Sequence, residues 1–324
     1  MELLNQSMNQ LKLNIDSERQ DGKPIHKMSL QSDYLTANLF GNFQYTTLPN
    51  TCQLLLSKYA PSLVDTPKKR NKQPNQLEFY AYFHHLDQIS QVLELPVSFP
   101  SYPTIKGFIN ENKQQFALQA HIPNIQTSGT QIDNLTISMD NSRDSLDLAI
   151  YMYNRLPKNN PTAAKIGDVK LHANLSALND KIQLKIQLDN TDSIRNEGTI
   201  HITSKLMKYA NQPLLDIHLQ PTHIILNDSA WTINESNITY NVHDKKLAIN
   251  DFELSTEYQS IAANGTASPN EEASITVNLR NIDVQYLLGY TEAGNAISVQ
   301  GPLTGWATLY GLFTSPMVEA QVHI

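Results

Sequence analysis

Strict alternation of apolar and polar residues is the feature that most limits how this chain can fold. Residues 181–189 read Lys-Ile-Gln-Leu-Lys-Ile-Gln-Leu-Asp, so the four aliphatic side chains occupy every second position. Successive side chains of a β-strand point to opposite faces, whereas the side chains of a helix repeat about every 3.6 residues. The segment is therefore predicted to form a strand with one apolar face and one polar face.

The same alternation recurs along the chain and predicts a fold made almost wholly of strands. In the second half it covers residues 199–203, 215–219, 231–233, 238–242, 247–249, 252–254 and 275–279. A less regular form covers residues 11–15, 34–39, 116–120, 135–139, 146–150 and 169–173. Turn residues such as Asn227-Asp228 and Asn264-Gly265 separate the segments. The connections are too short for crossover helices, so we expect roughly eighteen strands in an antiparallel meander, with 135–139 paired to 146–150.

A few short helices are expected to interrupt the strands. Residues 49–59 and 85–93 carry apolar side chains at helical spacing, and residues 283–288 are long enough for a single turn. Between the first two helices, residues 65–76 are rich in Lys, Asn and Pro and predict a disordered loop. Cys52, the one cysteine, lies in an apolar helical run, where we expect a buried structural thiol.

The apolar face of so many strands has to be covered. Sheets of more than about ten strands usually curl or split. This sheet can close on itself, fold into a sandwich, or curl into a trough that holds a ligand. In each case we expect one continuous all-β structure. Residues 1–165 would form its N-terminal part and residues 166–324 its C-terminal part.

The aliphatic residues of the alternating segments are the candidate binding residues. They either pack against one another in a closed core or line a trough, and alternation alone favours the core. The candidates are Ile182, Leu184, Ile186, Leu188, Ile200, Ile202, Leu215, Ile217, Leu219, Ile233, Ile238, Leu247, Ile249, Phe252, Leu254, Ile275, Val277 and Leu279.

Composition and motifs argue against several other classes of function. The formal net charge is −7, and the basic residues cluster only within residues 68–72, which does not favour nucleic acid as a partner. His201, His218 and His223 form no HxH or HExxH motif, so we expect no metal site. No GxSxG, Walker or GxGxxG motif occurs, and we predict no catalytic residue, no cofactor and no enzyme activity. No stretch approaches the roughly 20 apolar residues of a membrane span, and no signal peptide is recognisable.

The order of weak motifs in the last hundred residues is more specific than any one of them. Strand patterns at 231–233, 238–240 and 247–254 precede Asn264-Gly265-Thr266, and residues 301–311 close the series with Gly-Pro-Leu-Thr-Gly-Trp-Ala-Thr-Leu-Tyr-Gly. Earlier, Gly41-Asn42-Phe43 leads into Thr47-Leu48-Pro49-Asn50 as a strand that turns into a short helix. This order resembles the TamB family of the AsmA-like group, from the cell envelopes of Gram-negative bacteria. The Asn-rich composition resembles the Bacteroidota members of that family.

The resemblance implies a fold, a location and a function. The fold would be a long antiparallel meander curled lengthwise into an open groove, a β-taco. The chain would be an internal fragment of a longer periplasmic protein that is anchored in the inner membrane. The candidate residues would line the groove and shield phospholipid acyl chains during transport between the inner and outer membranes. A TamA-like outer-membrane barrel would be a partner, bound through regions that this fragment lacks. A structural or assembly scaffold for outer-membrane protein biogenesis remains the alternative.

Overall fold

The computed structural model describes residues 10–20, 22–92, 97–127, 131–155, 168–190, 194–209, 212–269, 273–283 and 301–323. Strands make up 67% of these described residues and helices 6%. The strand pairings are antiparallel and mostly join strands that follow one another along the chain, which confirms the predicted all-β antiparallel meander with a few short helices. The lengthwise curl into a groove concerns the shape of the whole chain and stays a prediction.

The chain divides into two compact units, which are described separately. The first unit comprises Met1–Arg155 and Ser176–Asn179, and the second comprises Leu156–Leu175 and Asp180–Ile324. The boundary that the sequence suggested, between residues 165 and 166, falls within 156–167, outside the described residues.

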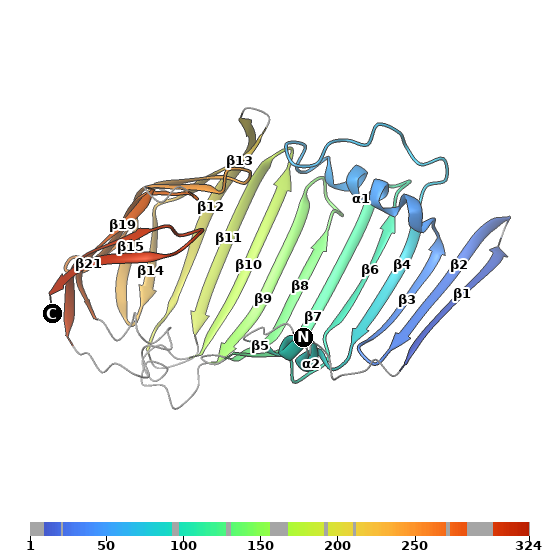
Figure 1. Cartoon of the computed structure of the whole chain (residues 1–324), viewed down its shortest axis with the longest axis horizontal. Coiled ribbons are helices and arrows are strands. Elements are labelled where there is room, and N and C mark those ends of the chain that lie inside the picture. The colour runs from blue at the N-terminus through green and yellow to red at the C-terminus, as the bar shows by residue number, and fades with distance from the viewer. Residues whose placement is uncertain are drawn as a thin grey trace. The chain divides into compact units, whose positions relative to one another are not determined.

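The first unit is a meander in which each strand pairs with a neighbour in sequence (Figure 1). The short β5 is the exception, because it pairs with the end of β7 and leaves β4 to pair with β6. The elements are β1 (Leu11–Gln20), β2 (Lys23–Ser32), β3 (Leu35–Asn42), the 3-10 turn η1 (Tyr45–Thr47), α1 (Leu48–Leu56), β4 (Gln76–Phe83), α2 (Leu86–Val92), β5 (Val97–Ser98), β6 (Thr104–Asn110), β7 (Gln115–Thr127), β8 (Gln131–Asp140) and β9 (Leu146–Arg155).

The second unit continues the meander with one inserted hairpin. β13 pairs with β16, and the hairpin of β14 and β15 that lies between them in sequence pairs with the start of β12 and the end of β17. Most of β10 belongs to this unit. The strands are β10 (Val169–Leu178), β11 (Lys181–Asn190), β12 (Glu197–Tyr209), β13 (Gln212–Leu219), β14 (Thr222–Leu226), β15 (Ser229–Ile233), β16 (Ser236–Asn241), β17 (Lys246–Ser255), β18 (Ser260–Ala267), β19 (Ser274–Asp283), β20 (Pro302–Tyr310) and β21 (Met317–His323).

Both of the longer predicted helices are present. α1 and α2 fall within the expected ranges 49–59 and 85–93 to within one residue at their starts, and α1 has Pro49 in its first turn. Cys52, however, is exposed, so the expectation of a buried thiol is wrong. Thr51 and Leu55, which lie one helical turn apart on α1, are buried, and Cys52 lies on the outer side of the helix. The single turn expected at 283–288 lies outside the described residues after Asp283.

A buried polar network attaches α1 and the following loop to the sheet. Glu111, in the turn between β6 and β7, is only 6% exposed. Its Oε2 atom accepts hydrogen bonds from Thr51 Oγ1 at 2.7 Å, from the Asn75 backbone N–H at 2.8 Å and from Asn71 Nδ2 at 3.0 Å. The loop expected at 65–76 is thus held at Asn71 and Asn75 by side-chain hydrogen bonds.

Glu111→Gln is expected to destabilise the first unit by about 2 kcal/mol. Three donors meet one carboxylate oxygen, and hydrogen bonds to a charged group contribute more than neutral ones. Urea unfolding monitored by circular dichroism measures the effect. Glu18→Gln is the matched control, because Glu18 forms an exposed ion pair with Lys27 and its loss should change stability by less than about 0.5 kcal/mol. Equal effects of the two substitutions would contradict the anchoring role of Glu111.

Where a residue other than glycine has a positive φ angle, that residue is usually Asn or Asp. In the described part of the chain, seven of the ten non-glycine residues with positive φ are Asn or Asp, the types that tolerate this region best. Asn227 and Asp228 form the two-residue turn between β14 and β15. Asp251 (φ 54°) and Asn281 (φ 55°) instead lie at bulges inside β17 and β19. The Asn-rich composition therefore serves turns and bulges alike.

Two expectations about these strands need correction. Residues 247–249 and 252–254, expected as separate strands, form the single strand β17, because the bulge at Asp251 lets the chain continue. Asn264-Gly265, expected as a turn, lies inside β18. Gly265 is needed there because its position, with φ 128°, leaves no space for a Cβ beside the backbone of Ser274.

Candidate functional site

The candidate residues lie together on one face of the second unit, because the pairing register aligns them from strand to strand. Leu184 of β11 lies opposite Ile202 of β12, which lies opposite Leu219 of β13. Ile217 of β13 lies opposite Ile238 of β16. Since residues two apart on a strand share a face, the remaining candidates of these strands lie on it too. We call this surface the apolar face of the second unit.

The register continues through the later strands. Ile238 lies opposite Ile249 of β17, and Leu254 of β17 lies opposite Ile261 of β18. Ile261 in turn lies opposite Leu279 of β19. The bulge at Asp251 keeps the alignment in phase, because it returns the residues after it to the same face as those before it. The structure therefore brings all 18 candidates onto one face.

Burial shows that this face is only partly covered. Of the 18 candidates, Ile233 and Ile275 are buried and the other 16 are half-buried, while none is exposed. Large aliphatic residues at the centre of a closed core are usually fully buried. Most of the apolar face therefore keeps some accessible surface on its side chains.

One part of the face is packed. Ile224, Trp231 and Ile233 of the inserted hairpin join Ile282 of β19 in a buried cluster, which we call the hairpin cluster. Five further candidates pack against it: Ile200, Leu219, Phe252, Leu254 and Leu279. The structure brings these side chains into contact with one another, as in a closed core. The other twelve candidates lie outside the hairpin cluster.

Ile224, Trp231 and Ile282 are residues that sequence reasoning missed. The signal for the hairpin was present in the two-residue turn Asn227-Asp228 between two short apolar segments. What the sequence did not reveal is that this hairpin pairs with β12 and β17, because that depends on β13 pairing with β16.

The first unit has an apolar face of its own that the candidate list did not include. Leu39 of β3 lies opposite Phe79 of β4, and Leu118 of β7 lies opposite Met139 of β8. Gly107 of β6 lies between Phe79 and Leu118, and a Cβ there would meet the Phe79 ring at 2.6 Å. These side chains are half-buried, as are Ile105, Ile137, Leu148 and Ile150 on the same face.

Short helices lie at the two ends of the strands in this unit (Figure 1). At one end the region of α1 is well packed, with Leu55 and Tyr59 buried together with Leu77 of β4 and Phe116 of β7. The rings of Tyr59 and Phe116 meet edge to face at 6.5 Å between centroids. α2 lies near the opposite strand ends, close to β5 (Figure 1). Dense packing is thus found near α1, whereas the middle of the face stays half-buried.

Two of the three histidines singled out from the sequence, His218 and His223, contact side chains on their own or an adjacent strand. His223 Nδ1 lies 3.0 Å from Thr232 Oγ1, and His218 Nε2 lies 3.6 Å from Asp216 Oδ2. Within the described ranges, no group of three or more His, Cys, Asp or Glu side chains is arranged to hold a metal ion. Partial burial raises the pKa of the Cys52 thiol, which keeps this exposed cysteine in its neutral form.

Comparison with known proteins yielded no relative: no family model, no curated protein and no solved structure matches the chain. Among the described residues, no helix is long and apolar enough to cross a bilayer.

Proposed function

We propose that this chain is a periplasmic segment of a TamB-like envelope protein that shields phospholipid acyl chains between the inner and outer membranes. The observation that supports the proposal most is that aliphatic residues are aligned from strand to strand on one face and are incompletely buried. Sixteen of the 18 candidate residues are half-buried, and the first unit repeats the arrangement. Such a face can contact a hydrocarbon chain without rearrangement of the strands.

The energetics suit a path for lipid tails. Each methylene of an acyl chain that leaves water for an apolar surface gains about 0.8 kcal/mol. The antiparallel ladders satisfy the backbone N–H and C=O groups, so a tail on the face would meet few unpaired polar groups. Neither a reaction nor a cofactor is needed for this role, and the protein would act as a surface rather than as an enzyme.

One observation favours the alternative of an assembly scaffold for outer-membrane proteins. All seven residues of β21 are exposed, although the strand pairs with β20 along its length. An exposed strand of this kind can accept an extended client segment by β-augmentation. The packed hairpin cluster would suit this reading as well, because a scaffold needs no space for a ligand.

Native mass spectrometry of the gently purified chain separates the two functions. If the apolar faces bind lipid tails, the protein should carry phospholipid masses that disappear after delipidation and return on incubation with phospholipid micelles. A protein that emerges free of lipid and takes up none would contradict the transport proposal and leave the scaffold in its place.

A further inference from the structure

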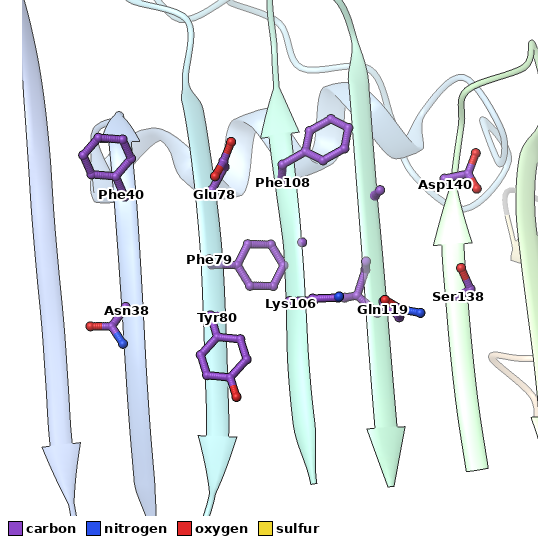
Figure 2. A pocket seen from close by; sticks show the side chains of 13 residues that line it. Asn38, Phe40, Glu78, Phe79, Tyr80, Lys106, Phe108, Gln119, Ser138 and Asp140 are labelled. Atoms are coloured by element: carbon purple, nitrogen blue, oxygen red, sulfur yellow. The ribbon is translucent and has the colours of Figure 1, made fainter. Parts of the chain in front are cut away.

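A second surface of the first unit, lined mostly by residues of the face opposite its apolar face, forms a hollow of about 630 Å³, which Phe79, Gly107 and Leu118 of the apolar face also border. Figure 2 shows it as two rows of side chains that cross β3, β4, β6, β7 and β8. A neighbouring hollow of about 400 Å³ shares Phe40, Glu78 and Phe108 with it and adds the amides of Asn42, Gln76, Asn110 and Asn112. The two hollows together make one continuous surface of mixed polar and apolar lining that crosses the strands, which we call the outer hollow.

The strand register explains the two rows. Phe40, Glu78 and Phe108 lie opposite one another on β3, β4 and β6. The second row places Tyr80 of β4 beside Lys106 of β6, which lies opposite Gln119 of β7. Neighbouring strands lie about 4.8 Å apart, so Phe40 and Phe108, two strands apart, are separated by roughly 10 Å.

The aromatic residues of the outer hollow are exposed to a degree that a packing role does not explain. Phe40 is 45% exposed, Tyr80 is 42% exposed and Phe108 is 41% exposed. The rings of Phe40 and Tyr80 turn their faces toward the viewer in Figure 2. An exposed ring face offers an apolar, slightly negative surface to a ligand.

The polar side chains between the rings are not committed to partners in the described part of the chain. No hydrogen bond or ion pair there engages the side chains of Glu78, Lys106, Gln119 or Ser138. Asp140 differs, because it accepts hydrogen bonds from the side chain and backbone of Ser142 at 2.6 and 2.9 Å. These bonds lower the pKa of Asp140, so its carboxylate stays ionised at the rim as an acceptor.

Charge narrows the class of ligand. The charged groups of the lining are two carboxylates, Glu78 and Asp140, and one ammonium group, Lys106. Phosphate groups and nucleic acids need clustered cations, which are missing from this lining. A neutral ligand rich in hydroxyl groups fits better, because carboxylates, amides and hydroxyls can accept from or donate to it. The apolar C–H face of a pyranose ring complements an exposed aromatic ring.

We propose that the outer hollow binds a neutral β-1,4-linked oligosaccharide. Pyranose rings would stack on Phe40, Tyr80 and Phe108, and their hydroxyl groups would bond to Glu78, Lys106 and Gln119. The separation between Phe40 and Phe108 is close to the length of a disaccharide in an extended β-1,4 chain. Within the first unit, most of the lining of this site lies on the face opposite the unit's apolar face, and the proposal does not depend on lipid binding.

Isothermal titration calorimetry of the whole chain with chitohexaose and with cellohexaose tests the proposal. We expect binding of at least one of the two, and the comparison shows whether the N-acetyl group contributes. Tyr80→Ala and Phe108→Ala should each weaken that affinity by about tenfold. Gln119→Ala should weaken it about threefold, which provides a readout should either aromatic variant fail to fold.

Tyr258→Ala is the matched control, because Tyr258 is an exposed aromatic residue of the second unit, 68% exposed and outside the hollow. This variant should bind as the unaltered chain does. The proposal is overturned if neither oligosaccharide binds the folded chain. It is equally overturned if binding survives Tyr80→Ala, Phe108→Ala and Gln119→Ala in folded proteins.

Discussion

Leu184→Arg should remove most of the lipid binding of this chain while leaving its fold intact. Leu184 is half-buried on the apolar face, opposite Ile202. An Arg there can turn its guanidinium toward water, so we expect a folding cost of only about 1 kcal/mol. About three methylenes of a bound acyl chain would lose their contact with the face. This loss lowers the binding free energy by about 2.4 kcal/mol, which is roughly fiftyfold in affinity. Displacement of a fluorescent fatty acid measures the change.

Gln183→Arg is the control for this prediction. Gln183 precedes Leu184 on β11, is exposed on the polar face and lies opposite Thr203. The same charge placed there should leave acyl-chain affinity within about twofold of the unaltered chain. Equal losses from both substitutions would show that the two faces are wrongly assigned. Retention of lipid binding by Leu184→Arg would argue against the proposed path.

The strands were predictable because alternation with a period of two indicates both that a segment is a strand and which of its side chains share a face. Residues 181–189 needed no tertiary information, since any other arrangement would scatter their aliphatic side chains. The pairing of 135–139 with 146–150 was likewise set by the short connection between them and is confirmed by the register of Ile137 with Ile150. Local pattern and local connection thus account for most of the meander.

The departures from alternation were not predictable in the same way. Ile249 and Phe252 are three residues apart, yet both lie on the apolar face. This spacing fits either two separate strands or one strand with a bulge, and which of the two forms depends on how the neighbouring strands pair. Asn264-Gly265 posed the same problem, because a turn and a kinked strand use the same residue types.

Strands that carry large side chains on both faces show no useful alternation of apolar and polar residues. β4 reads Gln-Leu-Glu-Phe-Tyr-Ala-Tyr-Phe, with Phe79 on the apolar face and Tyr80 on the opposite face, and both residues border the outer hollow. Periodicity cannot rank the two faces of such a strand, so neither the apolar face of the first unit nor the outer hollow was found from the sequence. Both became visible only when the register placed these residues beside those of β3 and β6.

Gly265→Val is expected to destabilise the second unit by about 4 kcal/mol. The backbone at Gly265 has φ 128°, which side-chain-bearing residues rarely adopt. A Cβ at this position would lie 2.3 Å from the Ser274 carbonyl oxygen and 3.0 Å from Ile275 Cα. Backbone strain and forced displacement of a paired strand each cost about 1–3 kcal/mol. Urea unfolding of the whole chain gives the measurement.

Ala263→Gly separates this steric effect from the general sensitivity of β18. Ala263 lies two residues before Gly265 on the same strand and face, opposite Phe252 and Val277. Removal of its methyl group relaxes the backbone and should cost only about 1 kcal/mol. At Gly265, β18 lies close beside its paired strand β19. A valine side chain cannot be accommodated there unless the two strands move apart. If Gly265→Val unfolds at the same urea concentration as Ala263→Gly, the close approach of Gly265 to Ser274 does not hold the strands in place.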